Sequence, residues 1–279
     1  MSMKVVEKID DMKRLRQQLT EPVGFVPTMG YLHEGHLALI RWARTENPSL
    51  VVSLFVNPTQ FDPQEDFSQY PRDPERDFGL LEKERADIVF MPSVDEMYPP
   101  RFNSWVEVGR LTERLEGASR PGHFRGVTTV VAKLFNIIQP TRAYFGQKDA
   151  QQVVVIKKMV AELNMNLEIV TVPTMREGDG LAMSSRNTYL NPEEREVATV
   201  LYQAISLAQK LWVRGETNAQ VIRQQMLTLI RKEPLAAIDY ISIADTETLD
   251  ELDTVKSPAL VSLAVKIGNT RLIDNVVLE

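Results

Sequence analysis

The chain has 279 residues, of which 43% are hydrophobic and 25% charged, so it can form one large domain or two smaller ones with a sizeable core. Its formal net charge of -6 argues against a general nucleic-acid-binding surface. No apolar run has the length of a membrane helix and charges begin at Lys4, so we expect a cytoplasmic protein without membrane span or signal peptide. The absence of cysteine excludes disulfides and thiolate catalysis.

Short β-branched runs alternate with helical patterns through the first part of the chain. The predicted strands cover 23–26, 50–56, 87–91, 143–146 and 167–172, and the predicted helices cover about 34–45, 74–86, 127–138 and 149–163. Strands and helices that alternate at this spacing indicate a parallel, doubly wound sheet with right-handed crossovers. Such a sheet binds ligands at the carboxyl ends of its strands.

The pattern changes after about Met175. A loop leads into a predicted long helix from Pro192 to about Arg214 and a second helix near 218–232, and three predicted strands follow at 238–244, 259–267 and 270–278. The sequence therefore predicts an α/β, Rossmann-like domain over residues 1–174 and a smaller α+β domain over residues 175–279. We expect the smaller domain to act as a lid.

The segment "PTMGYLHEGH" follows the first predicted strand and carries two of the three histidines, His33 and His36. Gly30 and Gly35 let backbone approach a ligand, and the N-terminus of the next helix offers unpaired N–H groups and partial positive charge. Two imidazoles one turn apart would face the same anion, which favours a phosphate site. Zinc is disfavoured because the spacing is not that of the metalloproteases, and two histidines that only satisfy local structure are the remaining alternative.

Two further segments carry groups suited to phosphate. "FGQKDAQQ" places Lys148, a point charge for a phosphate, and Asp149, an N-cap or ribose contact, directly after the fourth predicted strand, although a solvated turn explains the same residues. "MSSRN" follows "REGDGLA" and supplies Ser184, Ser185 and Arg186, which can surround a triphosphate on a loop made mobile by its glycines. A helix cap or a turn would also account for them.

Two other segments suggest a small polar ligand with an apolar body. "SLFVNPTQF" carries Asn57 and Gln60 at the start of a long loop, and loops of that length are often functional. "SRPGHFRGV" adds Arg120, His123 and Arg125 ahead of a predicted helix. A plain surface turn is an open alternative for each segment, but three of the motifs follow strand carboxyl ends, which favours one shared site.

The five motifs, in this order, resemble the pantoate–β-alanine ligases from about Gly24 to Asn187. The His-x-x-His element alone would indicate only the wider nucleotidylyltransferase superfamily. The resemblance implies ATP-dependent joining of pantoate to β-alanine, which gives pantothenate, AMP and pyrophosphate through a pantoyl adenylate, with Mg²⁺. It also implies a homodimer, and neither a nucleic acid nor a membrane as partner.

The resemblance assigns roles to the residues that match the family motifs. It places ATP on Met29, Gly30, Tyr31, Leu32, His33, Glu34, Gly35, His36, Gly146, Gln147, Lys148, Asp149, Met175, Met183, Ser184, Ser185 and Arg186. It assigns pantoate to Gln60 and Gln152, β-alanine to Gln60, and Mg²⁺ to Asp77 as a candidate. The implied catalytic set is His36 as proton donor with His33, Lys148, Ser184, Ser185 and Arg186. The chain departs from many relatives at Ala150, where an aromatic residue is expected.

Two other functions share part of this pattern. A nucleotidylyltransferase that leaves the nucleotide on its product would explain the two histidines, but not Gln60, Gln152 or the "RPGHFRG" segment. A non-catalytic nucleotide sensor would bind ATP without releasing pyrophosphate. Activation of a carboxylate as its adenylate needs no protein nucleophile, which agrees with the absence of cysteine.

Overall fold

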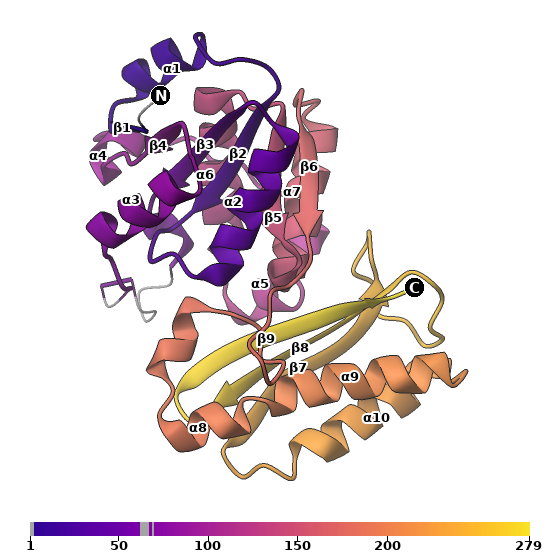
Figure 1. Cartoon of the computed structure of the whole chain (residues 1–279). Coiled ribbons are helices and arrows are strands. Elements are labelled where there is room, and N and C mark those ends of the chain that lie inside the picture. Colours follow the sequence, from indigo (N-terminus) through magenta and orange to yellow (C-terminus); the bar gives the residue numbers. More distant parts are fainter. Residues whose placement is uncertain (1–2, 62–66, 69) are drawn as a thin grey trace. The chain divides into compact units, whose positions relative to one another are not determined.

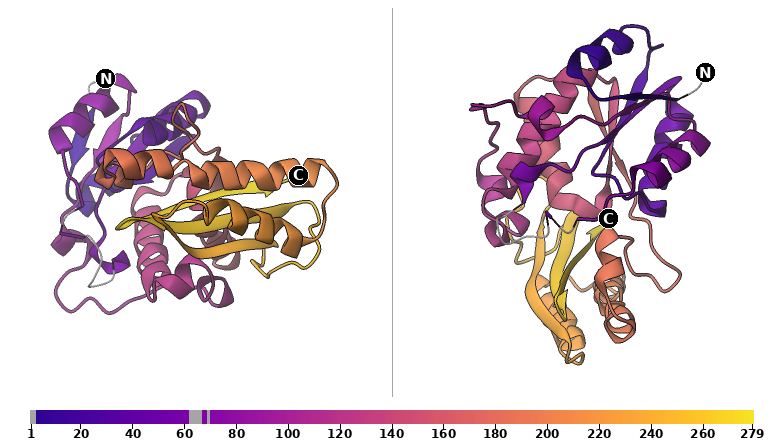
Figure 2. Two further views of the ribbon diagram at one scale, coloured as in Figure 1. Left: turned by 90° about the horizontal axis from the view of Figure 1, so that it is seen from below. Right: turned by 90° about the vertical axis from the view of Figure 1, so that its left-hand side faces the viewer.

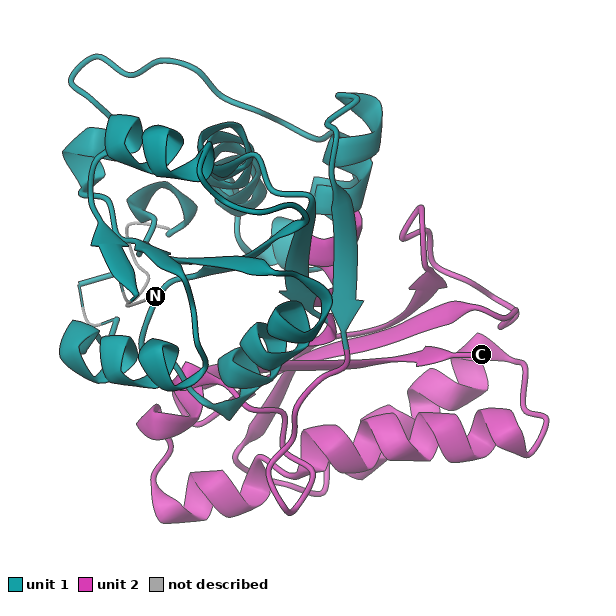
Figure 3. Ribbon diagram, turned by 45° about the horizontal axis from the view of Figure 1, so that its top comes forward, with its two compact units in different colours: residues 1–146, 155–172 teal, residues 147–154, 173–279 magenta. Residues whose placement is uncertain are grey.

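The structure, a computed structural model, describes residues 3–61, 67–68 and 70–279, so the predicted long loop after Asn57 lies partly outside the described residues. The chain divides into two compact units, coloured separately in Figure 3. Unit 1 contains residues 1–146 and 155–172, and unit 2 contains residues 147–154 and 173–279. Every helix in the described residues is too short or too polar to span a membrane.

The sheet of unit 1 is parallel throughout. In the described part of the chain its six strands pair in the order β1-β4-β3-β2-β5-β6. Their bounds are β1 Lys4–Val6, β2 Val23–Thr28, β3 Ser49–Leu54, β4 Ile88–Phe90, β5 Arg142–Gly146 and β6 Glu168–Val172. The strand order reverses between β2 and β5, so the carboxyl ends of these two strands are where a doubly wound sheet binds ligands. The predicted α/β fold class is confirmed.

Helices cover both faces of this sheet (Figure 1). Their bounds are α1 Ile9–Arg16, α2 Glu34–Glu46, α3 Pro74–Lys83, α4 Val94–Met97, α5 Glu116–Ser119, α6 His123–Ile138 and α7 Ala150–Glu162. Alternate residues of β2 point to opposite faces. Val26 belongs to the buried cluster that contains Leu37 of α2, whereas the ring of Phe25 lies 6.4 Å from that of Phe135 on α6.

Two features of unit 1 differ from the prediction. Helix α6 begins at His123 instead of 127, because Gly122 reaches a left-handed conformation (φ 82°) that turns the chain into the helix. Strand β1 and helix α1 were not predicted, since the charged N-terminal residues hide their short apolar pattern. The helix start matters for function because it puts His123 in the first turn of α6.

Unit 2 has an antiparallel sheet covered by helices. Strands β7 Ala236–Asp245, β8 Ala259–Ile267 and β9 Thr270–Leu278 pair in that order. Helices α9 Val200–Val213 and α10 Ala219–Ile230 pack on this sheet, with α10 on β7 and α9 on β8 and β9 (Figure 2). A shorter helix, α8 Pro192–Val197, precedes them. The predicted smaller α+β part is confirmed.

The prediction of a single helix from Pro192 to about Arg214 is wrong. The helix is interrupted at Ala198 and Thr199, between α8 and α9. The hydroxyl of Thr199 donates to the carbonyl of Glu196 at 2.9 Å, and the Thr199 N–H bonds to the same carbonyl at 3.3 Å. This local bonding competes with the regular helical pattern and interrupts it.

The packing of α6 against η1, the turn Pro58–Gln60, gives a test of the fold. A Cβ atom at Gly126 would lie 2.2 Å from the carbonyl oxygen of Thr59, whereas one at Gly79 on α3 would meet nothing within 4 Å. We expect Gly126→Ala to lower the free energy of unfolding by about 1–3 kcal/mol through overpacking. Gly79→Ala should raise it by about 0.5–1 kcal/mol because alanine favours the helix. Urea unfolding measures both, and equal effects would contradict this packing.

Candidate active site

The two neighbouring histidines close the N-terminus of α2. His33 is the N-cap residue, and its Nδ1 accepts a hydrogen bond from the backbone N–H of Gly35 at 3.1 Å. The Nδ1 of His36 accepts from the backbone N–H of His33 at 3.3 Å, so the two imidazoles form a reciprocal capping box. Their ring centroids are 4.0 Å apart.

These contacts determine which ring nitrogens carry the proton. A nitrogen that accepts a hydrogen bond is unprotonated, so His33 and His36 carry their proton on Nε2. Two rings this close also fit the neutral form, since two cations would repel each other. The pair therefore offers neutral N–H donors at the carboxyl end of β2.

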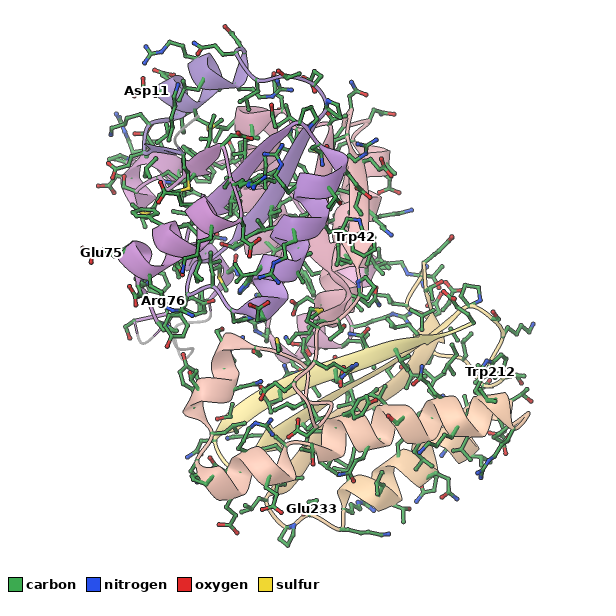
Figure 4. All side chains as sticks on the ribbon, viewed as in Figure 1. Asp11, Trp42, Glu75, Arg76, Trp212 and Glu233 are labelled. Carbon is green, nitrogen blue, oxygen red and sulfur yellow. The ribbon has the colours of Figure 1, made fainter. Side chains whose placement is uncertain are left out.

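The loop between β2 and α2 is anchored by a carboxylate from α3. Gly30 and Tyr31 have positive φ angles of 82° and 53°. The N–H of Tyr31 donates to Asp77 Oδ2 at 2.7 Å, and the N–H of Leu32 donates to Asp77 Oδ1 at 2.8 Å. The guanidinium of Arg76, labelled in Figure 4, lies 5.5 Å from the centre of the Tyr31 ring. The loop that precedes the histidines is thus held by hydrogen bonds to Asp77, a residue of helix α3.

Asp77, the predicted magnesium candidate, has a structural role in this geometry, and its metal role stays a prediction. The side chain is buried, which raises the pKa of its carboxyl group, while the N–H groups of Leu32 and Tyr31 act in the opposite direction. Both carboxylate oxygens are engaged by backbone. Among the residues that the structure describes, no group of three or more His, Cys, Asp or Glu side chains could hold a metal ion.

A hydrogen-bond chain orients Gln60. The carbonyl of Gly126 can only accept, so the atom of the buried Asn57 amide that lies 3.1 Å from it is Nδ2. The same Nδ2 donates to Gln60 Oε1 at 3.0 Å, and Asn57 Oδ1 accepts from the hydroxyl of Tyr98 at 2.8 Å. The Nε2 of Gln60 then faces the sulfur of Met29 at 3.2 Å. Gln60 consequently presents N–H donors next to the loop that carries the histidines.

His123 contacts the backbone of the turn Pro58–Gln60, whose Gln60 side chain the previous bonds orient. Its Nε2 lies 3.1 Å from the guanidinium of Arg120, which can only donate, so this nitrogen accepts. Its Nδ1 must then carry the proton and donate to the backbone carbonyl of Gln60 at 2.8 Å. The sequence pointed to Asn57 and His123 but gave them no role, because their bonds join segments far apart in the chain.

The other predicted site residues lie mainly in unit 2. Gly146 ends β5 in unit 1, and η3 Gln147–Asp149 follows it in unit 2. Lys148 Nζ lies 3.5 Å from Asp149 Oδ1 and is mostly buried, and Gln152 is half-buried in the first turn of α7. Glu34 is exposed at the start of α2 and pairs with Arg41.

Residues 175–183 of unit 2 form a hairpin that brings two of the predicted ATP contacts, Met175 and Met183, together. The N–H of Met183 donates to the carbonyl of Met175 at 2.9 Å. Ser184 caps the turn η4 Ser185–Tyr189, and its Oγ accepts from the N–H of Arg186 at 3.2 Å. Met183 to Arg186 are therefore held in one defined turn beside Met175.

The loop before this turn, which contains Gly178 and Gly180, was expected to be mobile, but several side-chain hydrogen bonds and ion pairs hold it. Arg195 on α8 donates to Glu177 at 2.7 Å and lies 2.8 Å from Asp179, whose pKa it lowers. The side chain of Asn187 donates to Glu177 at 2.7 Å and to the carbonyl of Ala182 at 3.1 Å. These bonds fasten the loop to its own unit.

The three histidines give a direct test of the site geometry. We expect His33 and His36 to be Nε2–H tautomers and His123 to be the Nδ1–H tautomer at a pH where all three are neutral. Long-range ¹H–¹⁵N spectra of protein labelled at histidine distinguish the two forms. Assignment is simple because His123→Gln removes one signal set. Nδ1–H signals from His33 or His36 would contradict the capping box.

Comparisons with known proteins show to which family the chain is related. Residues 4–277 match the family model described as pantoate-beta-alanine ligase. Pantothenate synthetase from Roseiflexus castenholzii is 58% identical over 277 residues, which are 99% of this chain and 100% of that protein. The protein of the same name from Thermotoga petrophila is 54% identical over 279 residues, which are 99% of this chain and 100% of that protein.

Solved structures that resemble this chain belong to the same family. The crystal structure of pantothenate synthetase from Thermus thermophilus matches with a TM-score of 0.94 and 48% identity, and the match covers 98% of this chain and 99% of that one. Pantoate-beta-alanine ligase from Francisella tularensis, complexed with beta-gamma ATP and beta-alanine, matches with a TM-score of 0.81 and 34% identity over 99% of this chain and 98% of that one. The chain belongs to the pantoate–β-alanine ligase family.

Proposed function

We propose that this ligase joins pantoate to β-alanine through an enzyme-bound pantoyl adenylate, with ATP as the second substrate. The observation that carries the proposal is the pair of Nε2–H donors, His33 and His36, beside the oriented amide of Gln60 in unit 1. The proposed donors to phosphate lie at the end of the loop between β2 and α2, and the proposed donor to the carboxylate, Gln60, contacts Met29 at the start of that loop. Adenylation of a carboxylate needs this combination.

In the first step, an oxygen of the pantoate carboxylate attacks the α-phosphorus of ATP, and pyrophosphate leaves. The Nε2–H groups of His33 and His36 donate to phosphate oxygens, with His36 as the proton donor of the set. Lys148, Ser184, Ser185 and Arg186 are proposed to stabilise the charge that grows on the pyrophosphate. Met29 to His36, Gly146 to Asp149, Met175 and Met183 form the rest of the proposed ATP site.

Gln60 and Gln152 are proposed to hold pantoate. A neutral amide orients a carboxylate while leaving it nucleophilic, whereas an arginine fork would stabilise its ground state. In the second step the uncharged amine of β-alanine, held by Gln60, attacks the acyl carbon. The acyl–oxygen bond to AMP breaks, the nitrogen loses a proton for which the phosphate of the leaving AMP is the proposed acceptor, and the amide of pantothenate forms.

The proposal includes Mg²⁺, a lid and a homodimer. Mg²⁺ commonly keeps several waters and binds through substrate phosphates, so it would enter with ATP without a cage of protein side chains. The C-terminal part from residue 175 would act as the lid over the nucleotide. The homodimer and a cytoplasmic location rest on the family resemblance.

The reaction products test the proposed chemistry. With ATP, pantoate and β-alanine together, we expect AMP and pyrophosphate in equal amounts. With ATP and pantoate alone, about one pyrophosphate per active site should form in a rapid burst, because the adenylate stays bound. Pantoate labelled with ¹⁸O in its carboxyl group should transfer one label to AMP. With all three substrates present, release of ADP and phosphate, or of pyrophosphate without AMP, would contradict this route.

His36→Ala tests the proposed donor. Removal of one group that stabilises charge in a transition state costs roughly 10²–10³-fold in kcat. We expect this loss with KM for ATP little changed, measured by initial rates with coupled pyrophosphate detection. Trp42→Phe, an exposed position on the same helix, serves as the control with normal rates. A change confined to KM would make His36 a ground-state contact only.

A further inference from the structure

Two polar residues are buried side by side in a strand that is otherwise largely apolar. Asp274 and Asn275 on β9 have exposed fractions of only 2% and 4%. Buried polar groups are destabilising unless each finds a hydrogen-bond partner. Their partners, all in unit 2, show what these two residues do.

Asn275 is bonded to η3, the turn that carries Lys148. Its Nδ2 donates to the backbone carbonyls of Gln147 at 3.0 Å and of Lys148 at 2.9 Å. Its Oδ1 accepts from the side-chain Nε2 of Gln147 at 3.0 Å. Since carbonyls only accept, the amide has one possible orientation, and both of its N–H groups are used.

Asp274 is bonded to the hairpin that carries Met175 and Met183. It accepts two hydrogen bonds from Arg176, at 2.7 and 2.9 Å. Arg176 also donates to the carbonyl of Gly180 at 3.0 Å, and its guanidinium lies 4.8 Å from the ring centre of Tyr202. One buried residue pair on β9 therefore holds two separate loops of unit 2.

We propose that Asn275 is a positioning residue that fixes Lys148 for catalysis, and that Asp274 holds the neighbouring nucleotide hairpin in the same way; this rests on the nucleotide role proposed above. A three-residue 3₁₀ turn such as η3 has few and poorly aligned bonds of its own. Two pinned carbonyls fix its backbone and hence the direction in which the Lys148 side chain leaves it. A misplacement of about 1 Å in such a group can cost 10²-fold in rate.

Asn275→Asp tests this with almost no change of shape. The new carboxylate replaces two donors by an acceptor that faces the carbonyls of Gln147 and Lys148, so both bonds are lost. We expect kcat/KM for ATP to fall about 10–100-fold at a temperature where circular dichroism shows a folded protein. Asn275→Ala, which removes the bonds without repulsion, replaces this variant if it fails to fold.

Asn218→Asp is the matched control in the same unit. Asn218 caps α10 through Oδ1, which accepts from the N–H groups of Gln220 and Val221 at 2.9 and 3.2 Å. Aspartate caps a helix as well as asparagine, so this variant should keep normal stability and normal kinetics.

A double-mutant cycle separates positioning from a general structural effect. If Asn275 acts through Lys148, Asn275→Asp should cost less than about threefold in a Lys148→Ala background. Losses that multiply in the double variant would overturn the proposal, and so would normal ATP kinetics in Asn275→Asp alone. Affinity for a non-hydrolysable ATP analogue, measured by calorimetry, gives the same comparison without turnover. Wild-type protein that binds this analogue but makes no AMP would contradict the proposed reaction and leave the binding comparison valid.

Discussion

The close approach of α6 to the turn after β3 is the constraint that orients Gln60, the residue proposed to hold pantoate. It requires glycine at position 126, since any side chain would collide with the backbone of Thr59. The same approach brings the carbonyl of Gly126 to the amide of Asn57, which has one possible orientation as a result. Because Asn57 Nδ2 donates to Gln60 Oε1, the orientation of the Asn57 amide also determines that of the Gln60 amide. The packing of α6 and the orientation of the proposed pantoate contact therefore depend on the same close approach of two backbone segments.

In the proposed function, neutral donors and cations have different tasks. In unit 1 the amide of Gln60 and the two capping imidazoles are neutral donors whose directions are set by backbone contacts. In unit 2 the candidates for the triphosphate include the cations Lys148 and Arg186. Both substrates of the first step are anions, so their approach must be favoured without making the carboxylate unreactive. Neutral donors suit the nucleophile, and cations suit the leaving pyrophosphate.

The sequence predicted the sheet well because buried parallel strands appear as continuous β-branched runs. It also located the loops that carry the motifs, since loops at strand carboxyl ends follow from the topology. It failed where the outcome depended on one local bond, as with Thr199 inside the predicted long helix. It failed again where the partner is remote: Asp77 reaches the N–H of Leu32 across 45 positions, which no local pattern reveals. Asp77 therefore has an anchoring role that the sequence did not indicate, and the metal role suggested for it stays a prediction.

Asp77 and Asn275 solve the same physical problem in different units. The loop between β2 and α2 contains glycine and the turn η3 is short, so the hydrogen bonds within each of them cannot define one conformation. A buried side chain from a distant element therefore bonds to two neighbouring backbone groups, N–H groups in one case and carbonyls in the other. A carboxylate suits the first and an amide the second, because the former only accepts and the latter has two donors on one nitrogen. The identity of each anchor thus follows from the backbone groups that its loop leaves unpaired.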